Sequence, residues 1–270
     1  MGDIDFSKGG YGGDVVETLF EDYTKTHLEY WWYFREVLRG SDRKSDYWRY
    51  VSNNRTLNNE EQKQLIAISL MNYAVVESIS EAIYCINELQ QLPNNELQFF
   101  NSRRIWKASY SSLNRGYNAI GNIVYVLLTK KPVLNTNNRN YSPQNAINKA
   151  ESSNRNLYVS NLKKIKKVIQ LRNHLDHYWI VWMGMRNNRL IFDKEFKKGK
   201  IVVEPSNLTF TDAIKRLDSD LYVVMNSLNE IYRELSKVDG LLDEYLFAKG
   251  WYIDYADFGK PHNGKRPQIK

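Results

Sequence analysis

The chain has 270 residues, of which 42% are hydrophobic and 13% aromatic, so it is long enough and apolar enough to bury a sizeable core. This composition argues against a disordered protein, and the single cysteine excludes an intramolecular disulfide and fits a reducing compartment. The 38 Lys and Arg residues outnumber the 31 Asp and Glu residues, and the formal net charge of +7 favours polyanionic partners.

Two further absences bear on where the protein works. Residues 1–14 are rich in Gly and Asp and hold no apolar stretch of the kind a signal peptide needs. The longest nearly apolar run, Ile123 to Leu128, is far shorter than the roughly 20 residues of a membrane-spanning helix. We therefore expect a cytoplasmic protein that does not enter a membrane.

The first half of the chain has the apolar spacing of helices. An aromatic-rich helix is expected from Glu17 to Arg39, ending at Gly40. Asn58 or Asn59 can cap the next helix, which ends before Pro93 and carries apolar residues at spacings of three, four and seven: Leu65, Ile68, Val75, Ile79, Ile83, Ile86 and Leu89. A second periodic run is closed by Pro132: Trp106, Tyr110, Leu113, Tyr117, Ile120, Val124 and Leu127.

The second half continues the helical pattern with one interruption. Ser142 and Pro143 can start a short helix. A long helix is expected over residues 158–183, on the stripe Tyr158, Leu162, Ile165, Ile169, Arg172, Asp176 and Trp179. The last expected helix has Thr211 as its N-cap and bends or ends at Gly240. Its apolar stripe consists of Ile214, Leu217, Leu221, Val224, Leu228, Ile231, Leu235 and Val238. Between these two helices, short apolar runs on either side of Lys198 and Gly199 predict a small β-hairpin.

These patterns predict an all-α fold, a helical bundle with long antiparallel helices, an N-terminal helical extension and a minor β-hairpin. We expect one domain over residues 1–270. Its extension covers residues 1–55, the bundle covers 56–250 with the hairpin near 190–203, and a basic C-terminal tail covers 251–270.

The chemistry concentrates in the segment Arg172-Asn173-His174-Leu175-Asp176-His177. Here an arginine is followed by a polar residue and, five positions on, by a histidine. A guanidinium group neutralises a phosphate through a planar fork of donors. An imidazole moves protons near neutral pH. These groups suffice to cut an RNA phosphodiester bond without a metal ion.

The segment resembles the RxxxxH ribonuclease motif of the HEPN superfamily, a group of small helical domains. The resemblance covers the six motif residues and the general helical pattern. It implies a metal-independent endoribonuclease in which the ribose 2′-OH attacks the phosphate. Arg172 would hold the phosphate, His177 would act as acid or base, and Asn173 would orient the substrate or His177. Such domains often serve as toxins or defence effectors, and the sequence identifies no inhibitor protein.

Four lysines precede the motif at positions 163, 164, 166 and 167. We assign Lys163, Lys166 and Lys167 to RNA binding, because a basic cluster beside a phosphate-cutting motif suits a polyanion. Solvated surface charge explains the cluster equally well.

Helical geometry raises a difficulty for catalysis. On an ideal helix His177 lies about 140° from Arg172, so one straight helix does not aim both side chains at one phosphate. A local irregularity, a helix break near the motif, or a second copy across a two-fold axis would each resolve this. Since HEPN domains commonly dimerise with their motifs facing one cleft, the resemblance implies a homodimer.

Two alternatives need no catalysis. Arg172 and Asp176 share the buried stripe, where an i,i+4 ion pair would lock the helix in a protein-interaction module. A non-catalytic module that binds RNA or a nucleotide is the other. No cofactor or metal is expected, because Asp176 points away from His174 and His177 and no second ligand cluster exists. Cys85 lies in a helical pattern and is interpreted as a small core residue.

Overall fold

The structure of the chain is a computed structural model. It describes Leu28, Tyr30, Trp31, Phe34 and residues 50–52, 55–56, 59–92, 99–130, 142–177, 184–186, 189–197, 200–237, 240–248 and 251–253. The side chains of residues 171–210 lie outside the described part, although the helix and strands there are assigned.

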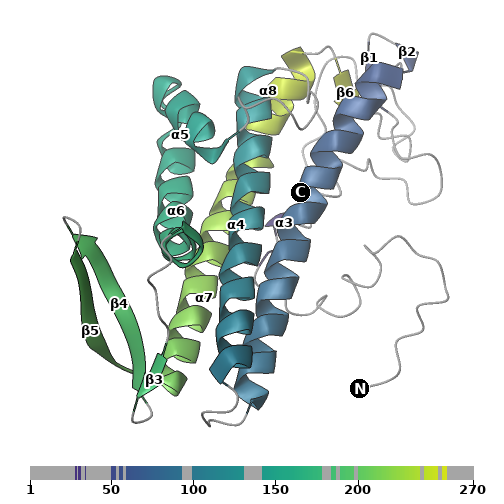
Figure 1. Cartoon of the computed structure of the whole chain (residues 1–270). Coiled ribbons are helices and arrows are strands. Elements are labelled where there is room, and N and C mark those ends of the chain that lie inside the picture. Colours follow the sequence, from purple (N-terminus) through teal and green to yellow (C-terminus); the bar gives the residue numbers. More distant parts are fainter. Residues whose placement is uncertain are drawn as a thin grey trace, which may run out of the picture.

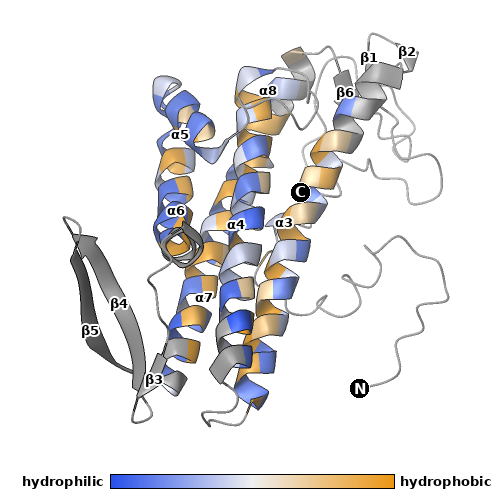
Figure 2. Cartoon of the chain, in the orientation of Figure 1, coloured by the Kyte–Doolittle hydropathy of each residue, from blue (hydrophilic) through white to orange (hydrophobic). Residues whose placement is uncertain are grey.

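The described part of the chain is mainly helical, which confirms the predicted all-α class. Figure 1 shows the long helices α3 (Asn59–Gln91), α4 (Phe99–Thr129), α6 (Asn156–His177) and α7 (Phe210–Leu235) side by side, with the short helices α5 (Pro143–Ser152) and α8 (Leu241–Ala248) at one end of them. Helix α4 is central, since it contacts α3, α5, α6, α7 and α8. Blue and orange alternate along the long helices in Figure 2, as expected where each buries one face.

Local sequence explains where several helices begin and end. At the start of α5, the Ser142 hydroxyl accepts a hydrogen bond of 3.2 Å from the backbone N–H of Asn145, and Pro143 occupies the first turn. Gly240 separates α7 from α8. A Cβ atom there would lie 2.6 Å from the carbonyl oxygen of Lys237, so only glycine fits this close approach. Helix α7 begins at Phe210, one residue before the predicted cap Thr211.

An apolar core runs between the helices. It contains fully buried aromatic residues from four of them, namely Trp106 and Tyr110 of α4, Tyr158 of α6, Tyr232 of α7 and Tyr245 of α8. The periodic residues that predicted α3 and α4 supply most of the remaining core on that side, as expected for amphipathic helices.

A short aromatic segment near the N-terminus lies over α3 and α7. Leu28, Trp31 and Phe34 are all 0% exposed. The indole N–H of Trp31 donates to the carbonyl of Asn72 at 3.0 Å, and the ring of Phe34 lies 5.4 Å from that of Tyr232. Most of the helix predicted over residues 17–39 lies outside the described residues.

Two small antiparallel sheets accompany the helices. One has the order β2-β1-β6 and joins Arg55–Thr56, Tyr50–Ser52 and Trp251–Ile253. The sequence did not predict it, because its strands are two or three residues long and carry no measurable alternation. The other has the order β3-β4-β5 and joins Gly184–Arg186, Arg189–Lys197 and Lys200–Thr209. Strands β4 and β5 include the residues for which the sequence predicted a hairpin. The side chains of these two strands lie outside the described part.

Among the described helices, none combines the length and the apolar character that crossing a membrane requires.

Candidate functional site

Helix α6 carries all the residues singled out for chemistry. Tyr158, Leu162, Ile165 and Ile169 form its buried stripe, each at most 3% exposed, and the helix contacts α4, α5 and α7. Burial of such a stripe holds the helix in place, because each buried aliphatic side chain contributes about 1.5–3 kcal/mol. The stripe therefore fixes the orientation of the rest of α6.

The motif occupies the last turns of this helix. Helix α6 runs without interruption through Arg172 and Asn173 and ends at His177. A helix break between the arginine and the histidine is thus not the arrangement found. The side chains of Arg172, Asn173, Asp176 and His177 lie outside the described part, so neither the predicted ion pair nor the catalytic geometry is described.

The helical repeat assigns the two motif positions to different faces of α6. Eleven residues make close to three turns, so a position repeats the face of the residue eleven before it. Position 172 therefore repeats the face of Asn161, which is 5% exposed and belongs to the buried side. Position 177 repeats the face of Lys166, whose ammonium group contacts the side chain of Gln144 on α5.

The predicted RNA-binding lysines are all described. The Lys163 ammonium lies 2.6 Å from a carboxylate oxygen of Glu151, and that of Lys166 donates to Gln144 Oε1 at 2.6 Å. Lys167 is exposed. Two of the three therefore contact α5, while all three remain on the outer side of the helix, away from the apolar stripe.

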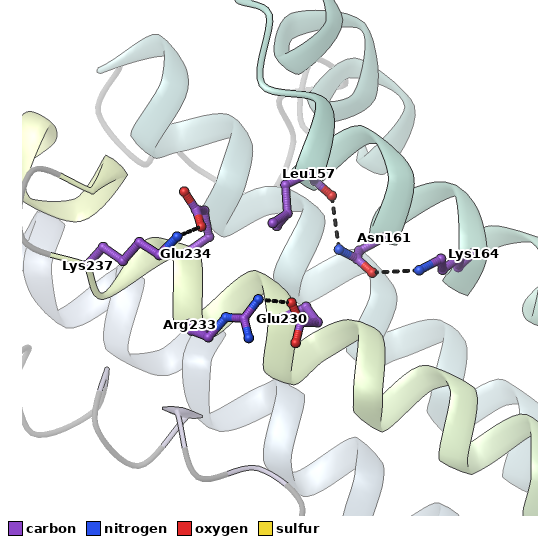
Figure 3. A network of polar contacts seen from close by, with 7 residues as sticks. All are labelled: Leu157, Asn161, Lys164, Glu230, Arg233, Glu234 and Lys237. Atoms are coloured by element: carbon purple, nitrogen blue, oxygen red, sulfur yellow. Dashed lines mark hydrogen bonds and ion pairs between the residues drawn. The ribbon is translucent and has the colours of Figure 1, made fainter.

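Charges on the neighbouring helix α7 are largely matched within that helix. Figure 3 shows Arg233 paired with Glu230 and Lys237 paired with Glu234, each three residues apart. On α6, Lys164 donates to the side-chain oxygen of Asn161 at 3.5 Å, a neutral partner. Glu230 and Glu234 thus pair with basic residues near them in the sequence rather than with the lysines of α6.

A polar contact that the sequence did not predict links α4 to α7. The phenol of Tyr110, which is 0% exposed, donates to Asp220 Oδ2 at 2.5 Å. Burial raises the pKa of Tyr110 far above its usual range, and the negative charge of Asp220 raises it further. Tyr110 belongs to an apolar stripe in the sequence and Asp220 lies far away along the chain, so no local pattern predicts their contact.

Within the described residues, no group of three or more His, Cys, Asp or Glu side chains could hold a metal ion. Cys85 is half-buried against the core, and burial raises the pKa of its thiol, with a further contribution from Glu88. A raised pKa keeps the thiol protonated and unreactive, in agreement with a packing role for Cys85.

Comparison with known proteins yields no match: no family model, no curated protein and no solved structure corresponds to this chain.

Proposed function

We propose that the chain is a metal-independent endoribonuclease of the HEPN kind, built as a helical bundle with a minor hairpin. The observation that carries this proposal is the Arg172-Asn173…His177 motif in the last turns of α6. A phosphate-binding arginine, a polar residue and a proton-transferring histidine occupy one short helical segment. The run of four lysines one to four turns earlier on the same helix supports a polyanionic substrate.

The chemistry needs three acts. A base removes the proton from the ribose 2′-OH, which attacks the adjacent phosphorus. A cation stabilises the charge on the phosphate, and an acid protonates the leaving 5′-oxygen. We assign the phosphate contact to Arg172 and proton transfer to His177, with Asn173 orienting the substrate or the imidazole. The products are a 2′,3′-cyclic phosphate and a 5′-hydroxyl end.

The uninterrupted course of α6 supports a homodimer. Since no break turns position 177 toward the face of position 172, two copies of the motif across a two-fold axis would supply the phosphate-binding and proton-transferring groups to one cleft. We place the interface near residues 172–182. Light scattering at micromolar concentration tests this, and a monomer that cleaves RNA would contradict it.

The lysines on α6 would contact the RNA backbone. The contacts of Lys163 with Glu151 and of Lys166 with Gln144 are compatible with this role, because exposed pairs of this kind contribute only about 0–1 kcal/mol and a phosphate can replace them. We also propose that the protein acts in the cytoplasm as a toxin or defence effector.

The decisive experiment incubates wild-type protein and His177→Ala with a mixed RNA pool in EDTA. We expect the wild type to leave 2′,3′-cyclic phosphate ends and to spare DNA, which lacks the attacking hydroxyl. His177→Ala should lose cleavage with an almost unchanged melting temperature. His174→Ala is the matched control, since this neighbouring histidine lies outside the motif, and it should cleave as wild type. Equal cleavage by wild type and His177→Ala would remove the histidine from the mechanism.

One observation favours a second candidate, a non-catalytic protein-interaction module. Lys163 and Lys166 both make contacts within the chain, which is what a purely structural role for these lysines requires. In that case Arg172 and Asp176 form a structural ion pair, and wild-type protein leaves every RNA intact in the assay above.

A further inference from the structure

The aromatic residues near the N-terminus bind a face that two helices share. On α3, the carbonyl oxygen of Asn72 accepts the indole N–H of Trp31 at 3.0 Å. The ring of Tyr73 meets the indole edge-on, with the ring centroids 6.3 Å apart. On α7, the side-chain oxygen of Asn229 accepts the backbone N–H of Tyr30 at 3.2 Å. The two helices therefore offer both hydrogen-bond acceptors and aromatic surface to the residues that lie on them.

Tyr232 of α7 belongs to the same face, since its ring lies 5.4 Å from that of Phe34. We name this surface the α3–α7 face, and it consists of Asn72, Tyr73, Asn229 and Tyr232.

The occupant of the α3–α7 face has the anchor pattern of a bound helical peptide. Leu28, Trp31 and Phe34 are three residues apart and fully buried, and Trp31 and Phe34 have helical backbone. Large apolar side chains at this spacing lie along one side of a helix, which is how an amphipathic helix binds the surface of a receptor protein. The α3–α7 face therefore holds its occupant through a row of apolar anchors.

This occupant leaves two polar atoms of the face unsatisfied. Asn72 is 1% exposed and Tyr232 is 0% exposed. Among the described residues, neither the Oδ1 atom of Asn72 nor the hydroxyl of Tyr232 has a hydrogen-bond partner. The side chains of Leu28 and Phe34 hold no polar atom, and the indole N–H of Trp31 already donates to the carbonyl of Asn72. Because a buried polar atom without a partner costs free energy, a helix with suitable polar side chains would fit this face better.

We propose that the α3–α7 face is a docking site for an amphipathic helix of a partner protein, and that the anchors Leu28, Trp31 and Phe34 occupy it as a tethered competitor. The partner helix carries large apolar side chains three residues apart and polar side chains that donate to Asn72 and accept from Tyr232. A second copy of this chain is the poorer ligand, because its own anchors leave the same two polar atoms unsatisfied. The docking site goes beyond the proposed ribonuclease and does not depend on it.

Peptide binding tests the site in the full-length chain. The emptied variant carries Trp31→Ala and Phe34→Ala, and the probe is a fluorescent peptide with the sequence of residues 24–38. Fluorescence anisotropy should show saturable binding to the emptied variant, at least about 10-fold tighter than to the wild type. The reason is that the tethered anchors of the wild type compete at an effective concentration of about a millimolar. A peptide with the same two alanines is the control and should not bind. Equal affinity for the two proteins, or no binding to the emptied variant, would overturn the proposal.

The emptied variant loses two buried side chains, so circular dichroism accompanies each titration. If its helical signal is lower than that of the wild type, the peptide should restore the signal, and a failure to do so would contradict the docking site. Phe34→Ala alone keeps the indole hydrogen bond to Asn72 and should bind the peptide with intermediate affinity. An affinity no higher than that of the wild type would count against the site.

The unsatisfied polar atoms are tested with Tyr232→Phe in the emptied variant, a change that removes the hydroxyl and keeps the ring. It should tighten binding of the peptide about 5-fold or more, because the peptide no longer covers an unpaired hydroxyl. Tyr117→Phe is the matched control, since Tyr117 is also buried with no partner for its hydroxyl among the described residues. It should leave the affinity unchanged. Unchanged binding in Tyr232→Phe would overturn the preference for a helix with polar side chains.

Light scattering distinguishes a partner protein from a second copy of this chain. Equal masses for the wild type and the emptied variant support a separate partner. A wild-type dimer that becomes a monomer in the emptied variant would assign the α3–α7 face to a second copy and overturn the proposal. The homodimer proposed near residues 172–182 does not interfere, because neither substitution touches that segment.

Discussion

Helices α3 and α6 both pack against α4, yet they present opposite charges to the solvent. From residue 64 to residue 91, α3 carries Glu77, Glu81 and Glu88 and no lysine or arginine. From residue 156 to residue 170, α6 carries four lysines and no acid. Their buried stripes have the same aliphatic and aromatic character. Packing therefore does not require either charge, so the outer faces of the two helices differ for reasons other than the core.

Contacts within the chain reinforce this difference. On α3, Glu81 pairs with Arg115 of α4 and also accepts a hydrogen bond of 2.8 Å from Ser112. On α6, the neighbours of the lysines are mostly neutral amides, and Glu151 is the one acid in contact with them among the described residues. We expect changes in the stripes to alter stability and changes on the outer face of α6 to alter binding.

The largest effect should come from the stripes. Ile79→Ala on α3 and Leu162→Ala on α6 each remove a side chain that is at most 1% exposed, and each should lower the free energy of unfolding by about 2–5 kcal/mol. Urea denaturation measures this. Leu70→Ala, at a position 64% exposed on α3, is the control and should change little. If Leu162→Ala left the free energy of unfolding unchanged, the buried stripes of α3 and α6 would not contribute equally to stability.

The two glycines of α4 should differ in a second test. A Cβ atom at Gly121 would lie 2.8 Å from three atoms of Pro143 at the start of α5, whereas one at Gly116 would lie 3.3 Å from Ser78 Cβ on α3. Gly121→Ala should therefore destabilise the protein by about 1–3 kcal/mol. Gly116→Ala should lower the free energy of unfolding by less, because alanine favours a helix over glycine by about 1 kcal/mol and this gain offsets the tight contact with Ser78. Equal melting temperatures for the two variants would show that α5 shifts freely on α4.

Alkaline titration should give a smaller effect. Burial raises the pKa of Tyr117 to about 12, and its hydroxyl has no hydrogen-bond partner among the described residues. The unfolded state loses this proton near pH 10 and the folded state retains it, so stability is full below pH 10 and falls as the pH rises to about 12. Tyr117→Phe should be neutral or slightly stabilising at pH 7 and should unfold less readily above pH 10. Tyr84→Phe, 63% exposed, should follow the wild-type curve.

Charge removal on α6 should have the smallest effect on stability and a clear one on RNA binding. Lys163→Gln with Lys167→Gln changes two exposed lysines four residues apart, and should alter the free energy of unfolding by less than about 1 kcal/mol. Affinity for single-stranded RNA should fall, and the slope of log affinity against log salt should decrease by about 0.7 for each phosphate that is no longer neutralised. Glu77→Gln on α3 is the matched control. Unchanged salt dependence in the lysine variant would assign these lysines to the structure alone.

The sequence predicted the helices well and the site only in part. The stripes from Leu65 to Leu89 and from Trp106 to Leu127 repeat over many turns, and the predicted helices coincide with α3 and α4 to within a few residues at most ends. The motif was visible because Arg, Asn and His stand within six residues. The contact between Tyr110 and Asp220 was not, because it joins residues 110 positions apart and depends on the relative register of two helices. A local pattern holds no information about that register.

The pairing of β1 with β6 has a consequence for synthesis of the chain. Val51 lies opposite Tyr252, so this ladder joins strands about 200 residues apart. At roughly 5–20 residues per second, β1 leaves the ribosome on the order of 10–40 s before its partner is made. Throughout that interval, the backbone N–H and C=O groups of β1 that later pair with β6 must form hydrogen bonds with water or with the edge of another strand. A nascent chain that stops short of Trp251 cannot close this ladder, so the β1–β6 pairing forms only after helices α3 to α8 have been synthesised.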